Sequence, residues 1–290
     1  MREQAQQFDP RQNMLTHSFE VFHYKDACLD PVAMHHHDFF EVYLFLSGRV
    51  EYRVEGRTYC LAPGDLLLIS PLELHQPIVE ASQKPYERIV LWINRGFLES
   101  FATERATLTR CFDSTQPNHT NLLRLTSAQR TAVTAQMGKL VRESYVIEYG
   151  SSQYVLGIFL QLMVEINRMA LLTVKDCSIQ DGPPELVAQL LEYIGEHFCE
   201  ELSLDSLAER FYVSKYHLSH TFQSAVGTSV YRYIILKRLL MAKQMLAGGI
   251  PAGVVCRSCG FKDYANFFRA FKSEYGISPK AYVEMNFHAP

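Results

Sequence analysis

Two copies of one helical pattern lie within the last hundred residues or so of this chain, and no other feature constrains its fold as strongly. In the first copy, at 204–222, a short helix begins near Asp205 and ends before a turn at Tyr212 and Val213. Ser214 follows the turn, where a serine side chain accepts a hydrogen bond from the backbone N–H groups that open a helix. The pattern predicts two helices joined by a tight turn.

The second copy, at 252–271, repeats this plan. Gly260 makes the turn, and Asp263 caps the helix that follows. Phe267 and Phe271 lie four residues apart, so they share the inner face of that helix. The tail is therefore predicted to hold two helix-turn-helix units.

The outward faces of the two capped helices carry mostly polar and aromatic side chains. Such groups can reach base edges or phosphates in a groove of DNA. Leu218 and Phe222 face inward in the first helix, which leaves its other sides to solvent. The outward candidates for DNA contact are Lys215, Tyr216, Ser219 and His220 in the first helix, and Tyr264, Ala265, Asn266, Phe268, Arg269 and Lys272 in the second.

Charge and spacing in the tail both suit a polyanionic partner. Residues 214–290 contain ten Lys and Arg against three acids, whereas the whole chain has a net charge of -3. This asymmetry suggests that one end of the chain meets a polyanion. Residues 229–246 form a helix of about 27 Å at about 1.5 Å per residue. Such a spacer could hold two helices in major-groove segments about 34 Å apart.

The segments LDSLAERFYVSKYHLSHTF and GFKDYANFFRAFKSEYGISPKAY, with the arginine-containing helix between them, resemble the DNA-binding domain of the AraC/XylS family over about 100 residues. The resemblance implies base contacts from a subset of the outward positions. Phe268 and Ala265 make poor hydrogen bonds, which favours contact with thymine methyl groups there. The same alignment places Cys256 and Cys259 in the core, and this placement argues against a role for them in zinc binding or redox chemistry. The base-contacting positions implied are Tyr216, Ser219, His220, Tyr264, Ala265, Phe268 and Arg269.

The front of the chain has a different pattern. From 41 to 93, short runs rich in Val, Ile, Leu, Tyr and Phe alternate with turn residues about every 8 positions, as in a small antiparallel barrel or sandwich. His35, His37, Glu41 and Gly48 form H-x-H-x3-E-x6-G, and His75 follows further on. This spacing resembles the cupin pattern, which implies a barrel with these side chains at its mouth.

Three interpretations of these polar residues stay open. They could line a pocket for an uncharged effector such as a sugar, bind Fe, Mn, Ni or Zn, or have a structural role only. His75 lies eleven positions after Gly64, a longer separation than the cupin pattern usually has, so His75 need not point inward. We assign them to an effector and assign no metal or cofactor. The candidates for effector binding are His35, His37, Glu41, Tyr43 and His75. The sequence does not decide whether His36 and Tyr43 lie in the pocket or on the surface.

Helical periods follow Trp92, at 97–101, 127–145 and 151–172. The last of these is apolar around more than one face, so it needs two partners. The barrel could be one of them, and for the other we expect a second subunit, with burial within the same chain as the alternative. This helix is not expected to span a membrane, because Gln161, Glu165 and Arg168 interrupt its apolar stretch. The chain starts without the apolar segment of a signal peptide, so we expect a cytoplasmic protein.

These patterns predict two domains. An N-terminal all-β cupin-like barrel with a helical dimerisation segment occupies 1–172, a linker 173–184, and an all-α double helix-turn-helix domain 185–290. The function expected is that of a sequence-specific transcription regulator and not an enzyme. We expect an activator, and the sequence leaves a repressor as the alternative. The expected partners are promoter DNA, RNA polymerase, a small-molecule effector and a second copy of the chain. The alternative is a metal-dependent cupin enzyme with a DNA-targeting tail.

Overall fold

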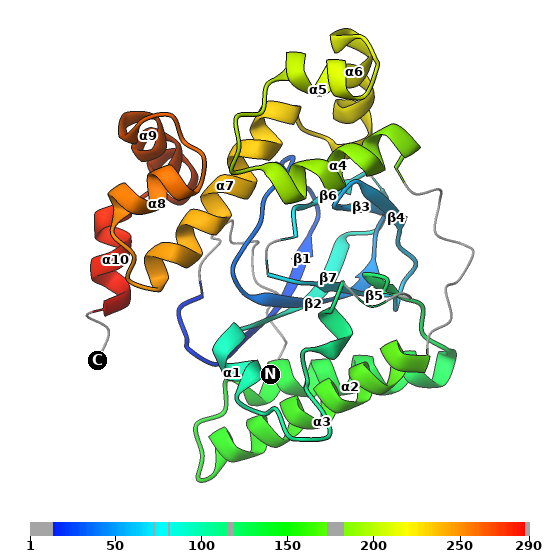
Figure 1. Ribbon diagram of the computed structural model, residues 1–290. Coiled ribbons are helices and arrows are strands. Elements are labelled where there is room, and N and C mark those ends of the chain that lie inside the picture. Colours follow the sequence, from blue (N-terminus) through cyan, green and yellow to red (C-terminus); the bar gives the residue numbers. More distant parts are fainter. Residues whose placement is uncertain are drawn as a thin grey trace. The chain divides into compact units, whose positions relative to one another are not determined.

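The structure is a computed structural model that describes residues 14–287, except 72, 81, 115, 117, 118 and 173–182. The chain divides into two compact units, a β-rich unit with helices and an all-helical unit, shown in Figure 1. Most of the predicted linker, 173–184, lies outside the described residues. The predicted fold class is confirmed: the first unit contains β-sheets with a helical segment, and the second unit is helical.

The first unit contains two antiparallel sheets. The larger has the order β1-β7-β2-β5-β8 and the smaller the order β4-β3-β6. The strands are β1 (Phe19–Asp26), β2 (Phe40–Ser47), β3 (Val50–Val54), β4 (Arg57–Cys60), β5 (Leu66–Ile69), β6 (His75–Val79), β7 (Tyr86–Ile93) and β8 (Leu122–Leu123).

Strand β2 shows how the sequence builds two cores. Val42 and Leu44 point to one side and pack in the core shared with the helices. Tyr43 and Phe45 point to the other side, into a core shared with the smaller sheet. Successive side chains of a strand alternate between faces, so a strand covered on both sides is apolar almost throughout. Glu41 is the charged exception within β2, and it lies on the same face as Tyr43.

Two long helices lie side by side against the larger sheet (Figure 1). They are α2 (Ser127–Glu143) and α3 (Ser151–Leu172), and shorter turns form α1 (Arg95–Glu99) and η1 (Arg110–Phe112). Within the described part, α3 alone is long and apolar enough to cross a membrane by length and composition. Its Phe159, Leu162 and Met163 are buried in the core. Tyr154, Leu171 and Leu172 remain exposed, so the predicted second partner stays a prediction.

The helical unit follows the predicted caps closely. Its helices are α4 (Glu185–His197), α5 (Leu204–Arg210), α6 (Lys215–Val226), α7 (Val230–Ala247), α8 (Ala252–Ser258), α9 (Tyr264–Tyr275) and α10 (Pro279–Phe287). Ser214 and Asp263 cap α6 and α9 as expected, and Ser229 caps α7. The turn of the first helix-turn-helix unit holds Tyr212 at a φ of 53°, and the turn of the second helix-turn-helix unit holds Gly260 at a φ of 77°.

Candidate functional site

Helix α6 presents a polar face on a firmly packed base. The Ser214 hydroxyl accepts a hydrogen bond from the N–H of His217 at 3.2 Å and so satisfies a donor of the first turn. Leu218 and Phe222 are buried, as predicted. Of the four predicted DNA contacts here, Tyr216, His220 and Lys215 are exposed and Ser219 is half-buried. The Tyr216 and His220 rings stack with 5.9 Å between their centroids.

Helix α9 carries a chain of hydrogen bonds along its outer face. Asp263 accepts from the N–H of Asn266 at 2.7 Å and from its side-chain Nδ2 at 2.6 Å. Asn266 Oδ1 in turn accepts from Arg269 Nη2 at 2.6 Å. The Arg269 guanidinium is therefore oriented before any ligand arrives. Tyr264, Ala265, Asn266, Arg269 and Lys272 are exposed as predicted, while Phe268 is half-buried, which limits its reach.

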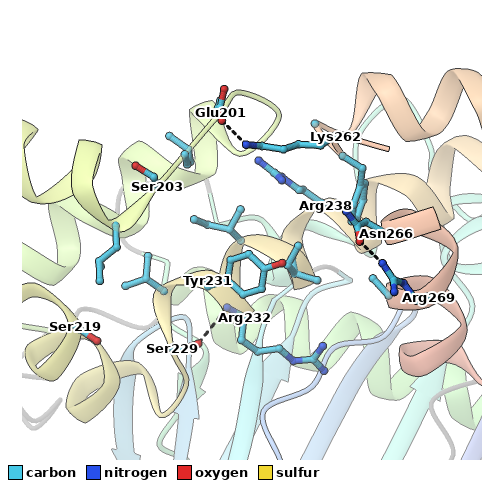
Figure 2. Close-up of a pocket in the computed structure, with 18 residues that line it drawn as sticks. Glu201, Ser203, Ser219, Ser229, Tyr231, Arg232, Arg238, Lys262, Asn266 and Arg269 are labelled. Carbon is cyan, nitrogen blue, oxygen red and sulfur yellow. Dashed lines mark hydrogen bonds and ion pairs between the residues drawn. The ribbon is translucent and has the colours of Figure 1, made fainter. Parts of the chain in front are cut away.

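A hollow of about 710 Å³ lies between the two helix-turn-helix units (Figure 2). Its walls come mainly from α7 and from the segments 201–204 and 260–262, and one residue of α6 and three residues of α9 complete the lining. Figure 2 shows Ser219 at one end of the hollow and Asn266 and Arg269 at the other, with Tyr231 and Arg232 between them. The helix between the units, α7, has 18 residues and so spans about 27 Å. The labelled side chains that line the hollow are Glu201, Ser203, Ser219, Ser229, Tyr231, Arg232, Arg238, Lys262, Asn266 and Arg269.

A second polar site lies inside the β-rich unit. An isolated β-bridge joins His35 to His75, with backbone hydrogen bonds of 3.1 and 2.9 Å. The bridge brings the ring of His75 to within 4.2 Å of the His35 ring and 4.7 Å of the His37 ring, measured between centroids. The side chain of His75 thus points into the cluster in spite of its long separation from Gly64 in sequence.

Three side chains of the cluster are closed to solvent, whereas His35 is half-buried. His37, Glu41 and His75 are all buried, and one ligand-type atom from each lies within 4.8 Å of the other two. Burial lowers the pKa of His75 well below its usual range, and the neighbouring imidazoles of His35 and His37 add to this shift. Burial by itself would raise the pKa of Glu41, but His37 and other neighbours outweigh it, so that pKa is lowered. The site favours neutral His75 beside an ionised carboxylate.

Two family models match the chain over these sites. The model described as AraC-like ligand binding domain matches 22–153, which includes the cluster, and the one described as helix-turn-helix domain matches 207–285, which includes α6 and α9. The chain belongs to the AraC family of transcription regulators.

Relatives of this AraC-family chain include the HTH-type transcriptional activator RhaS of Escherichia coli, 24% identical over 250 residues that cover 85% of each chain. RhaS of Citrobacter koseri is also 24% identical, over 247 residues and 85% of each chain. Among solved structures, ToxT from Vibrio cholerae is 14% identical, with a TM-score of 0.39 over 94% of this chain and 99% of that one. The two family models and the RhaS relatives show an AraC-family DNA-binding regulator with an N-terminal ligand-binding domain.

Sequence reasoning missed several residues of this AraC-family regulator. Trp92 donates from Nε1 to Glu41 Oε2 at 2.8 Å, and it is the single tryptophan of the chain. Tyr43, one of the effector candidates, is buried with its hydroxyl 2.5 Å from that of Tyr86. The alternation of β7 places Trp92 and Tyr86 on one face of the strand, but only the pairing of β7 with β2 shows that Glu41 and Tyr43 share that face.

Two cations of the basic tail do not face solvent. Arg238 donates 2.7 Å hydrogen bonds to the carbonyls of Phe198 and Glu200, which lie just past α4. Lys243 is buried, with its Nζ 5.0 Å from the centre of the Tyr275 ring. These side chains hold helices together, so the charge available to a polyanion is smaller than the sequence count suggested.

Proposed function

We propose that this regulator activates transcription by binding promoter DNA through α6 and α9, in response to a small molecule bound in the β-rich unit. The observation that supports this most strongly is the pair of capped helices α6 and α9. Their polar faces are exposed, and residues of both line the hollow between the two helix-turn-helix units. About 27 Å of rigid helix between the units suits two successive major-groove segments, which are about 34 Å apart.

The DNA contacts would divide by chemistry. Arg269 and Asn266 suit guanine and adenine edges in the major groove. Tyr216, His220, Lys215 and Lys272 suit phosphates or mixed contacts, and Ala265 with the half-buried Phe268 suits thymine methyl groups. Ser219 and Tyr264 complete the two faces that we assign to DNA.

For the effector we infer a carbohydrate, which binds beside His35, His37, Glu41, Tyr43 and His75. A sugar needs acceptors and donors for its hydroxyl groups and aromatic surface for its C–H faces, and binding sites of this kind combine a few polar groups with aromatic walls. Glu41 and the histidines supply the first, and Tyr52, Trp92 and Phe39 of the same core supply the second.

A regulator explains the chain better than a metal-dependent enzyme with a DNA-targeting tail. The relatives named RhaS are transcriptional activators, which is a role without catalysis. We accordingly propose RNA polymerase as a partner, a homodimer formed through α3, and a cytoplasmic location. The effector would act by binding one arrangement of the protein more tightly than another.

Footprinting tests this proposal. The full chain is added to DNA upstream of its own and neighbouring genes at two salt concentrations, with and without candidate sugars. We expect protection of two adjacent major-groove segments, weaker at higher salt, and a change in protection with one sugar. Absence of sequence-preferring protection in every condition would contradict the proposed regulator.

A further inference from the structure

The first helix of each helix-turn-helix unit ends with the same hydrogen bond. In the first unit, the N–H of Val213 donates to the carbonyl oxygen of Ala208 at 3.0 Å, five residues back. In the second unit, the N–H of Phe261 donates to the carbonyl oxygen of Cys256 at 3.1 Å, again five residues back. A helix that ends in this way has its residue before the donor in the left-handed region. Each turn therefore needs one residue with a positive φ.

That place is filled by Tyr212 in the first unit and by Gly260 in the second. Glycine adopts the left-handed region freely because it has no Cβ, whereas a bulky side chain is strained there. Helices commonly end on glycine for this reason. Tyr212, at a φ of 53°, is thus a strained residue at a position that suits glycine.

The side chain of Tyr212 does not support the fold. It is 95% exposed, and no hydrogen bond, ion pair or ring contact joins this side chain to another residue of the described ranges. The buried side chains of the same unit are others, among them Leu207, Leu218 and Phe222. Strained backbone that persists without an internal contact is typical of binding sites, so we look for the partner of Tyr212 outside the chain.

Tyr212 lies at the start of the first DNA-facing helix. It is two residues before the cap Ser214 and four before Tyr216, which is also exposed. A recognition helix points its N-terminal residues at base edges, so the turn before it lies beside the phosphates that border the major groove. Lys215, whose ion pair with Asp205 is exposed on both sides, adds a positive charge at the same place. These surroundings suit the DNA backbone.

Tyrosine has the chemistry for a phosphate contact. Its hydroxyl group donates a hydrogen bond to a phosphate oxygen, and proteins use tyrosine for this contact. Hydrogen bonds to a charged acceptor are stronger than those between neutral groups. A tyrosine also loses little conformational entropy when it is held, because it has only two χ angles.

We propose that Tyr212 binds a phosphate of the promoter DNA through its hydroxyl group and thereby positions α6 in the major groove. This contact rests on the proposed function, since it requires that α6 meets DNA. The contact carries no sequence information of its own, because phosphates are the same at every base pair. Tyr212 is a positioning residue for the base contacts that α6 makes.

Two variants of the full chain separate the hydroxyl group from the strain. Tyr212→Gly removes both, so it should keep or raise the Tm, by up to about 8 °C, while the Kd for promoter DNA rises about tenfold. Tyr212→Phe removes only the hydroxyl group, so it should bind about tenfold more weakly at an unchanged Tm. The Tm is measured by far-ultraviolet circular dichroism and the Kd by fluorescence anisotropy of labelled DNA.

Ethylation interference locates the contact on the DNA. An ethyl group on a single phosphate weakens binding wherever the protein contacts that phosphate. We expect one phosphate beside the first major-groove segment to interfere with the wild type but not with Tyr212→Phe. The slope of log affinity against log salt should be the same in both proteins, because a neutral tyrosine releases no counterion.

The matched control is Tyr149, a fully exposed tyrosine of the β-rich unit whose φ is not positive. Tyr149→Phe and Tyr149→Gly should leave the Kd and the interference pattern as in the wild type. Tyr149→Gly relieves no strain, so it should not raise the Tm.

Three outcomes would overturn the contact: wild-type affinity in both Tyr212 variants, a lowered Tm in Tyr212→Gly, or an unchanged interference pattern in Tyr212→Phe. Loss of transcription activation with unchanged DNA binding would also overturn it, and would assign Tyr212 to a protein partner. A wild type that protects DNA while the variants bind equally well contradicts this contact alone. A wild type that protects no DNA contradicts the proposed function, and the contact with it.

Discussion

At the scale of single residues, Arg269 shows how a recognition side chain is prepared. It is held by Asn266, which is held by the capping carboxylate of Asp263, so the guanidinium already has a defined direction on the exposed face of α9. A preorganised donor loses less conformational entropy when it binds. To bind a base edge, Arg269 must either share its N–H donors between Asn266 and the base or give up the hydrogen bond to Asn266.

Replacing Arg269 by Ala should relax base preference at one position of the operator. If Arg269 contacts guanine, discrimination at that base falls by about 1–3 kcal/mol while other positions keep theirs. The measurement is affinity for a set of operators with single base changes. Arg257→Ala is the control for base preference, because Arg257 is exposed on α8, outside the recognition helix, and any loss of affinity that it causes should be equal on every operator. An equal loss on every operator would assign Arg269 to a phosphate instead.

Gly260 illustrates a residue whose side chain is excluded by the backbone. It has a φ of 77°, and a Cβ added there would lie 2.3 Å from the carbonyl oxygen of Cys199. Gly260→Ala should therefore destabilise the helical unit, with the backbone conformation alone costing about 1–3 kcal/mol and the overlap adding to it. Thermal unfolding followed by far-ultraviolet circular dichroism gives the change.

The matched control for Gly260 is Gly253→Ala in α8 of the same helix-turn-helix unit. A Cβ there meets no other atom within 4 Å, and alanine favours the helix by up to about 1 kcal/mol. Gly253→Ala should leave the Tm unchanged or raise it. Similar losses in both variants would mean that the contact with Cys199 is not what restricts Gly260.

At the scale of helices and strands, the sequence predicts what is locally encoded. The helix-turn-helix boundaries follow from Ser214, Gly260 and Asp263, because caps and turns depend on neighbours within a few residues. Contacts between residues on different strands cannot be predicted from local residues in this way. The bridge between His35 and His75 joins segments forty residues apart, so spacing alone left the direction of His75 open. The structural roles of Arg238 and Lys243 also depend on distant partners.

Helix α3 depends on one buried amide that the sequence did not single out as structural. Asn167 Oδ1 accepts from the N–H of Cys111, and its Nδ2 donates to the carbonyls of Leu108 and Met163, all at 2.9 Å. This side chain ties α3 to the segment around η1. An apolar helix packed on a sheet can rotate or slide, and such directional contacts fix one arrangement.

Asn167→Ala should lower the free energy of unfolding of the β-rich unit by about 2–6 kcal/mol, because two buried backbone groups lose their partner at about 1–3 kcal/mol each. Urea unfolding followed by Trp92 emission reports on this unit alone, since the helical unit contains no tryptophan. Gln161→Ala, on the exposed side of α3, should change stability by less than about 0.5 kcal/mol. Equal stability of the two variants would contradict this role for Asn167.

At the scale of the whole molecule, charge is segregated along the chain. The whole chain has a net charge of -3, but its tail, residues 214–290, contains ten Lys and Arg and three acids. Binding of a polyanion through that tail is therefore electrostatic in spite of the negative total. The structure reduces the number of usable charges, because Arg238 and Lys243 are buried and Arg232 pairs with Glu274.

The remaining exposed cations set the salt dependence of DNA binding. Lys215, Arg257, Lys262, Arg269, Lys272 and Lys280 are exposed, and about four or five phosphate contacts among them would give a slope of log affinity against log salt of about -4 per bound chain. Lys272→Ala should reduce that slope by about 1 and weaken binding to all sequences alike. Arg105→Ala, exposed in the β-rich unit, should leave it unchanged. A slope near zero, or the same slope in Lys272→Ala as in the wild type, would show that this face of α9 does not meet the DNA backbone.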